Sequence, residues 1–271
     1  MRGVFIAFRV GVGLFLLQHF LRLLPYAPAL FSDQGMFPDP GYAFWILFPS
    51  PLRFFGSPAA ATAFVALNAA LALAFALGLG RRGVALGLWY GLASLAARNF
   101  MSFNLSLNFL GWLLLACALI PPGEGWALGG HRDPDWAVPD TLRRGFWAIL
   151  GLAYTVSGLA KLEQAEWVHG EAVSRLLASG IARHNALGEA LLALPAPALQ
   201  AMSWTALGLE LLHLPLIALR PTRPLAWLGV VAMHALIGAT TTITELSLAM
   251  ILVQLFVFDL RWITAWAPRK R

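Results

Sequence analysis

A single lysine ends an otherwise apolar segment of the chain that is long enough to cross a membrane. The segment from Gly145 to Leu162 reads GFWAILGLAYTVSGLAKL, and Lys161 is its only charged residue. An amine at a bilayer boundary can become a base, because burial among apolar side chains disfavours its charged form. Lys161 is therefore the strongest candidate for a reactive group in this sequence.

Other ionisable residues lie within apolar segments, where they are costly and require a reason. Glu210 and His213 are three apart in LELLH, which predicts that they share a helix face, and His234 lies in the next apolar segment. We expect these side chains to line a cavity near Lys161. The alternatives are an ion pair of Glu210 that holds helices together, and histidine hydrogen bonds that serve helix packing.

Two amides and a tryptophan complete the candidate residues. Asn104 and Asn108 lie in NLSLN, where an apolar run begins. They are expected either to bind a carbonyl or carboxylate of a ligand or to cap the start of a helix. Trp167 follows Lys161 in KLEQAEWVHG, and its simplest interpretation is an anchor at the membrane interface.

The composition predicts a membrane protein. Of 271 residues, 59% are hydrophobic and 12% are charged, which is more apolar surface than one soluble core of this size can bury. The net charge of +6 resides mostly in short loops between apolar runs, so the expected partner is the lipid bilayer and not nucleic acid. Cys117 is the only cysteine, and HExxH, HxxH and GxSxG patterns are absent, so neither a metal site nor a serine hydrolase is expected.

Apolar runs that can cross about 30 Å of hydrocarbon predict an all-α polytopic bundle of about eight helices, formed as a single domain over residues 1–271. With both termini in the cytoplasm, 13 of the 19 lysine and arginine residues fall on the inner side, and Lys161 falls on the outer side. The predicted spans are Val4–Leu24, Ala59–Leu79, Gly83–Phe100, Leu105–Ile120, Arg144–Leu162, Leu199–Ala218, Leu225–Thr242 and Leu246–Trp262.

Two long loops, residues 25–58 and 163–197, fall on the predicted outer face, and we expect them to cover a pocket that opens outward. The first is rich in Pro, Gly and aromatic residues, and the second has the apolar spacing of one or two short amphipathic helices. The inner-face loop GEGWALGGHRDPDWAVPDT has no phosphate-binding or metal motif. Arg9, in the first predicted span, is interpreted as snorkelling to the inner headgroups.

Two stretches of the chain resemble the vitamin K-dependent gamma-carboxylase family, including its bacterial members with a horizontally transferred transmembrane (HTTM) domain. The stretch YTVSGLAKLEQAEWVHG is similar to a family pattern of an aromatic residue, a small-Gly-x-x-Lys-Leu segment, an acidic residue and Trp-x-x-Gly. The order of Glu210, the tripeptide Thr222-Arg223-Pro224 and His234 is similar to a second family pattern. The resemblance extends over essentially the whole chain.

The resemblance implies a specific chemistry and a place for it. A lysine at the position of Lys161 deprotonates a reduced, vitamin K-like quinone, O2 converts it to an epoxide, and the strong base so formed removes a proton from a substrate glutamate, to which CO2 adds. A quinone pocket is implied with Asn104, Asn108, Tyr154, Trp167, Glu210, His213 and His234 around Lys161 as catalytic base. The expected location is the bacterial inner membrane.

Two departures from the family pattern keep a second function open. The chain has FNLSLNFL, with Leu107, where the carboxylases carry a histidine, and it ends at Arg271 where they continue into a lumenal domain. The alternative is a non-enzymatic accessory membrane protein for the export or maturation of a secreted peptide. Transport lacks support, because the sequence shows no pair of broken spans.

Overall fold

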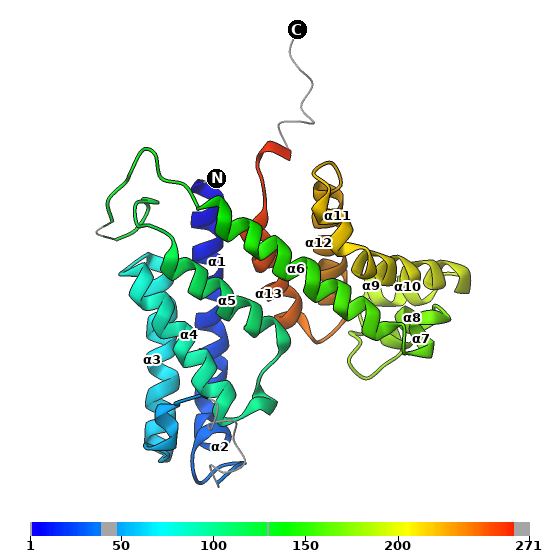
Figure 1. Cartoon of the computed structure of the whole chain (residues 1–271). Coiled ribbons are helices and arrows are strands. Elements are labelled where there is room, and N and C mark those ends of the chain that lie inside the picture. Colours follow the sequence, from blue (N-terminus) through cyan, green and yellow to red (C-terminus); the bar gives the residue numbers. More distant parts are fainter. Residues whose placement is uncertain (1, 39–47, 129, 263–271) are drawn as a thin grey trace. The chain divides into compact units, whose positions relative to one another are not determined.

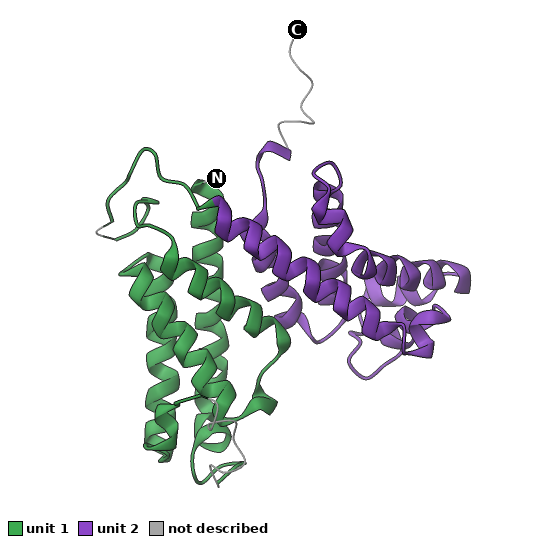
Figure 2. Ribbon diagram, viewed as in Figure 1, with its two compact units in different colours: residues 1–139 green, residues 140–271 purple. Residues whose placement is uncertain are grey.

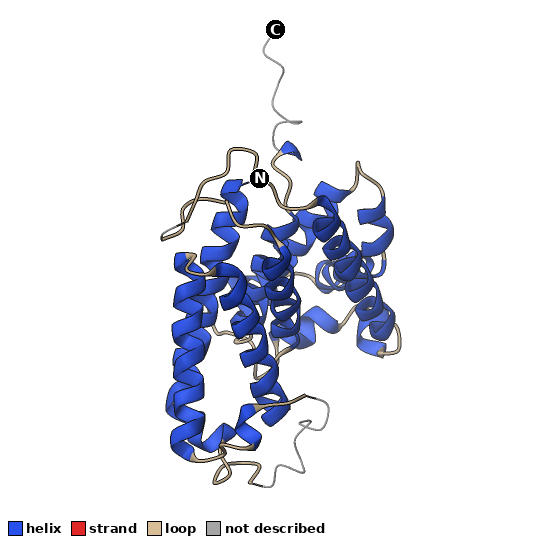
Figure 3. Cartoon of the chain, turned by 60° about the vertical axis from the view of Figure 1, so that its left-hand side comes forward, coloured by secondary structure: helices blue, strands red, loops and turns tan. Residues whose placement is uncertain are grey.

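The described chain is helical throughout. A computed structural model describes residues 2–38, 48–128 and 130–262, and these residues form helices and turns without a β-strand (Figure 1 and Figure 3). The predicted all-α class is therefore confirmed. Two further stretches lie outside the described residues: 39–47, in the middle of the first long loop, and 263–271, at the C-terminus. The second stretch contains three of the basic residues counted above. Two compact units, residues 1–139 and 140–271, are each described by themselves (Figure 2).

Unit 1 is built on two long antiparallel helices and two shorter ones. Helix α1 packs along α3, and α4 packs against both α3 and α5. Gly13 allows the close approach of α1 to α3, because a β-carbon there would lie 2.6 Å from the backbone nitrogen of Ala76. The helices are α1 (Arg2–Leu23), α2 (Ala27–Phe31), α3 (Pro58–Leu77), α4 (Arg81–Arg98) and α5 (Leu105–Leu119), with 3-10 turns at Leu24–Tyr26, Pro51–Arg53 and Phe100–Ser102.

Unit 2 is arranged around its first helix, α6, which contacts α10, α11 and α13. The segment 163–197 contains three short helices, where one or two were predicted. The helices are α6 (Asp140–Lys161), α7 (Ala165–Val168), α8 (Ala172–Leu177), α9 (Ala186–Leu192), α10 (Ala196–Leu211), α11 (His213–Ala218), α12 (Arg223–Thr240) and α13 (Thr244–Val257).

Helix length limits the number of membrane spans. Among the described residues, three helical segments are long and apolar enough to cross a membrane, namely Arg2–Phe31, Pro58–Leu77 and Arg223–Thr240. The pair α9 and α10, bent by 108°, makes a fourth if it is one span. Each of the eight predicted segments is helical, but the count of eight spans is not confirmed: α5, with 15 residues, is about 22 Å long and thus shorter than the hydrocarbon core.

The long helices of unit 1 are apolar on more than one face. Helix α3 buries Val65 and Phe75 inside the unit, yet Leu67 and Leu73 on the same helix are 54% and 43% exposed. A helix in a soluble protein normally presents polar residues on its outward face. These apolar outward faces are compatible with a membrane protein.

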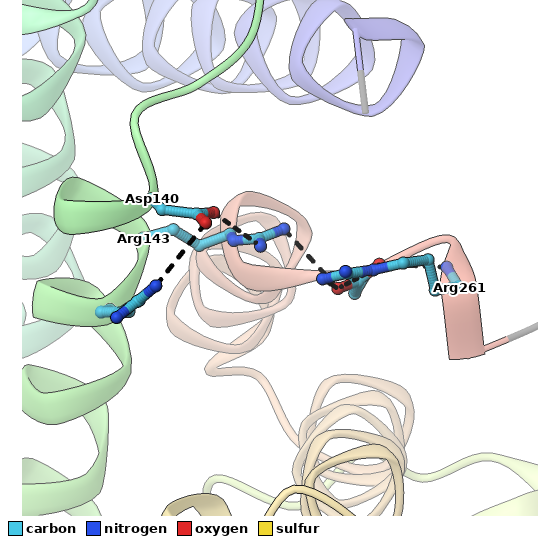
Figure 4. Close-up of polar contacts among 5 residues, drawn as sticks. Asp140, Arg143 and Arg261 are labelled. Carbon is cyan, nitrogen blue, oxygen red and sulfur yellow. Dashed lines mark hydrogen bonds and ion pairs between the residues drawn. The ribbon is translucent and has the colours of Figure 1, made fainter.

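Ion pairs join the start of α6 to the segment that follows α13. Arg143 lies 3.0 Å from Asp140 on its own helix and 3.7 Å from Asp259, which also binds Arg261 at 2.5 Å (Figure 4). Charged groups of this kind gather at the ends of apolar helices, where headgroups and water can solvate them. The network fixes the end of α13 against α6 within unit 2.

Candidate functional site

Lys161 forms an ion pair with Glu210 in unit 2. The ammonium nitrogen of Lys161, the last residue of α6, donates hydrogen bonds to Glu210 Oε2 at 2.6 Å and to Ser157 Oγ at 2.7 Å. The Lys161 side chain is 20% exposed and that of Glu210 only 9%. Two residues singled out separately in the sequence are thus brought into direct contact, at the edge of the interior of the unit.

A glycine in α6 sets how closely the two helices approach. A β-carbon on Gly158 would lie 2.6 Å from the backbone nitrogen of Leu211 and 3.0 Å from its Cα. Because backbone atoms cannot rotate away as a flexible side chain can, any larger residue at 158 has to push α6 and α10 apart. Lys161 is less than one helical turn beyond Gly158, so this close contact holds its amine within reach of Glu210.

The sequence predicted a span from Leu199 to Ala218, and the structure shows a helix interruption within it, at Leu212. Helix α10 ends at Leu211 and α11 begins at His213. Pro215 has no backbone N–H to continue the hydrogen-bond ladder. The hydroxyl of Thr155 in α6 compensates: it accepts a hydrogen bond from Leu214 N at 3.1 Å and lies 3.4 Å from the Leu211 carbonyl oxygen.

The break changes the expected relation between Glu210 and His213, since they belong to two different helices. Both side chains are buried, and both meet α6: Glu210 contacts Lys161, while the His213 ring lies 4.7 Å from the ring of Tyr154, measured between centroids. The prediction that they share one helix face is therefore wrong, although both side chains contact the same helix, α6. Helix α6 packs against both sides of the break.

Tyr154 and the two histidines form a buried polar cluster. The Tyr154 hydroxyl lies 2.9 Å from His234 Nε2, in α12, and His213 has no exposed surface. Neither ring nitrogen of His213 has a hydrogen-bond partner among the described residues, nor does Nδ1 of His234. Buried polar atoms in native proteins are normally satisfied, so three unpaired nitrogens around one tyrosine are unusual.

The ion pair and the polar cluster lie near each other. Tyr154 and Lys161 both belong to α6, two helical turns apart. The indole ring of Trp167, in α7, lies 5.2 Å from the Lys161 ammonium, a distance at which the ring face attracts a cation. Trp167 therefore covers the amine directly, in addition to the interfacial role that its sequence context suggests.

The two asparagines belong to unit 1. Asn104 caps α5, because its Oδ1 accepts a hydrogen bond from the backbone nitrogen of Ser106 at 3.1 Å. Asn108 is exposed on the first turn of the same helix. Capping was the alternative that the sequence offered for these amides. Their contribution to a ligand site stays a prediction.

Several residues of the site were missed in the sequence. Ser157 binds the Lys161 amine, and its position four residues earlier in a helix was a readable signal. Gln254 in α13 is fully buried beside Tyr154 and was visible as a lone amide in the apolar run ILVQLF. Thr155 carried no signal, since its role depends on a helix break that only packing reveals.

The arrangement supports proton transfer at a polar site that is largely closed to water. Lys161 and Glu210 share a strong hydrogen bond across which a proton can move, and Tyr154 and His234 form a second such pair. Among the described residues, no three His, Cys, Asp or Glu side chains come together in a way that would hold a metal ion. The two hydrogen-bonded pairs offer, as candidate chemistry, a base and its hydrogen-bonding surroundings.

Comparison with known proteins relates the chain to one domain family. The model of the HTTM domain matches residues 7–262, which cover most of both units and every residue of the candidate site. No curated protein and no solved structure matches the chain.

Proposed function

Because the chain belongs to the HTTM domain family, we propose that it is a membrane enzyme related to the vitamin K-dependent gamma-carboxylases. In this proposal Lys161 is the base that removes a proton from a hydroxyl of a reduced quinone or a similar lipid-soluble substrate. The observation that carries the proposal is the hydrogen-bonded pair of Lys161 and Glu210, beside a buried polar cluster with unpaired nitrogens.

The unpaired nitrogens fit a substrate with oxygen atoms on a flat ring. Leaving a buried donor or acceptor without a partner costs about 1–3 kcal/mol, so His213 and His234 favour a ligand that supplies hydroxyl or carbonyl groups. A quinol would supply the acidic hydroxyl and the reducing electrons of the reaction, and O2 would be the oxidant. Tyr154 contacts both histidine rings and would orient such a ring.

Glu210 can accept the proton that the Lys161 ammonium has to lose before Lys161 acts as a base. A charged ammonium cannot accept a proton, and in the described state Lys161 is fully engaged with the carboxylate. If the ammonium passes one proton to Glu210, a neutral amine and a neutral carboxylic acid remain, and burial penalises this pair less than two separate charges. The amine nitrogen then takes the proton of the substrate hydroxyl: an N–H bond forms, the O–H bond breaks, and the electron pair stays on oxygen as an oxyanion.

The test compares the purified wild type with Lys161→Met, which keeps an unbranched side chain as far as Cε and removes the amine. Mass spectrometry measures the quinones retained by each protein and the epoxide formed when vitamin K hydroquinone and O2 are added. We expect epoxide from the wild type, none from Lys161→Met, and undiminished formation in Arg175→Gln, which removes a 62% exposed cation of the same unit. Epoxide formation by Lys161→Met would refute the role of this residue.

One observation favours the accessory function as the second candidate. Leu107, at the position where the carboxylases carry a histidine, is fully buried in α5 and offers no group for acid or base chemistry. An accessory protein for a secreted peptide would retain that peptide in stoichiometric amount, without bound quinone, and Lys161→Met would retain it equally. The same purification therefore distinguishes the two functions.

A further inference from the structure

A cavity in unit 1 lies far in sequence from Lys161 and the residues around it. It has a volume of about 380 Å³ and is formed by the turn between α3 and α4 together with the loop that follows α5. That loop is the one to which the sequence alone assigned no chemistry. The lining residues that matter here are Gly78, Gly80, Arg81, Arg82, Glu124 and Ala127.

Two arginines line the cavity, and only one of them has its charge balanced by an acidic side chain. Arg81 is buried, pairs with Glu124 at 2.7 Å and donates to carbonyl oxygens, among them that of Pro121 at 2.7 Å. Its charge is thus balanced within the fold. Arg82 is exposed and donates only from Nε, to the carbonyl oxygen of Ala118 at 2.7 Å. No acidic side chain of the described residues pairs with Arg82, so its charge is directed to whatever enters the cavity.

A third arginine, Arg9, does not line the cavity but lies directly against Gly78, which does. Arg9 has no exposed surface, and its Nη2 donates to the carbonyl oxygen of Trp126 at 2.6 Å, which shows that the predicted snorkelling to headgroups is wrong. Its Nε and Nη1 have no hydrogen-bond partner. The guanidinium lies against Gly78 and Ala127, because a β-carbon on Gly78 would overlap Nη1 and approach Ala127. Nη1 thus points at the part of the wall where Gly78 has no side chain.

The first turn of α4 adds backbone donors on the same side. Gly80 precedes the helix in a left-handed conformation, with φ of 51°, and its residue type provides no side-chain cap. The first N–H groups of an 18-residue helix have no intrahelical partner and carry the positive end of the helix dipole. Such helix starts bind phosphate and other anions when basic side chains lie nearby.

We propose that this cavity binds a phosphate group, which Arg82 and the first turn of α4 contact directly and which the buried charge of Arg9 attracts through the wall. The balance of charge supports it: Arg81 and Glu124 cancel, whereas Arg9 and Arg82 leave the cavity positive. An anionic phospholipid headgroup and free phosphate share this chemistry. The site is independent of the proposed reaction at Lys161.

The experiment titrates the full chain, purified in a maltoside detergent, with three probes at constant ionic strength. The probes are dihexanoyl phosphatidylglycerol, dihexanoyl phosphatidylcholine and inorganic phosphate, and isothermal calorimetry measures the dissociation constants. The variants are Arg82→Gln, which removes the charge of an exposed side chain, and Arg82→Lys, which keeps it. The matched control is Arg144→Gln, because Arg144 is 79% exposed and belongs to unit 2.

We expect the wild type to bind phosphatidylglycerol or phosphate, and Arg82→Gln to bind the same probe at least about tenfold more weakly. Arg82→Lys should recover part of the affinity, and Arg144→Gln should bind like the wild type. Binding of phosphatidylglycerol alone identifies a lipid headgroup as the source, and binding of inorganic phosphate identifies a soluble one. Absence of binding to either, equal binding by Arg82→Gln, or an equal loss in Arg144→Gln would overturn the proposal.

Discussion

The close contact at Gly158 yields the sharpest prediction about how the Lys161 site is held together. Replacing Gly158 with Ala places a β-carbon 2.6 Å from the backbone nitrogen of Leu211, where no side-chain rotation can relieve the overlap. Overpacking costs about 1–3 kcal/mol, and the better helix propensity of Ala returns about 1 kcal/mol. Since the obstacle is backbone, the upper part of the range applies, and we expect Gly158→Ala to lower the free energy of unfolding by about 1–2 kcal/mol.

The same helix offers a matched control. A β-carbon on Gly145, near the start of α6, would meet no atom within 4 Å, so Gly145→Ala gains helix propensity without a clash. It should leave stability unchanged or raise it by up to about 1 kcal/mol. Unfolding in detergent, followed by circular dichroism against increasing dodecyl sulfate, measures both variants. The contact at 158 is refuted as the cause if Gly158→Ala unfolds at the same detergent fraction as Gly145→Ala.

Three further predictions concern unit 2. A double-mutant cycle of Lys161→Met and Glu210→Gln, measured by the same unfolding assay, should give a coupling of about 2–3 kcal/mol, since the pair is largely buried; a coupling near zero would contradict the geometry. Thr155→Val should lower the free energy of unfolding by about 1–2 kcal/mol, because Leu214 N at the helix break loses its hydrogen-bond acceptor. Thr205→Val should lower it by less, because it removes only an exposed hydrogen bond within α10, to the carbonyl oxygen of Ala201. The hydrogen bond from Arg261 lowers the pKa of Asp259, so the Asp259 carboxylate stabilises the fold fully above about pH 4 and progressively less as the pH falls below that value. The difference in unfolding free energy between the wild type and Asp259→Asn should therefore shrink as the pH is lowered below about 4. A difference that stays constant with pH would contradict this prediction.

Part of the site could be predicted because burial of charge is costly wherever it occurs. Lys161, Glu210 and His234 were singled out as ionisable groups in apolar segments, and the fold brings Lys161 and Glu210 to 2.6 Å. The same argument applied equally to Arg9, but its surroundings depend on Gly78 and Trp126, more than sixty residues away. The free-energy cost of burying a charge identifies which residues need a partner, but it does not identify that partner.

The helix interruption shows where local patterns fail. The residues from Leu199 to Ala218 are apolar enough to predict one span, and Pro215 alone does not require a break, since prolines occur within membrane helices. The break at Leu212 is stabilised by Thr155 from another helix, so the deciding contact is not within the segment. The count of eight spans is not confirmed for a related reason, because apolar length sets an upper limit on a helix and tertiary turns set its actual ends.

The sequence by itself determined the helical class, the apolar character of the helices and the identity of the costly buried charges. These follow from composition and from spacing over a few residues, which the chain carries whatever its fold. Only the tertiary structure decided that Gly158 brings Lys161 to Glu210 and that Tyr154 contacts two histidines. It also decided that an unremarkable loop closes a basic cavity around Arg82. Contacts between distant segments depend on how closely backbones approach, and this is a property of packed helices that no single helix encodes.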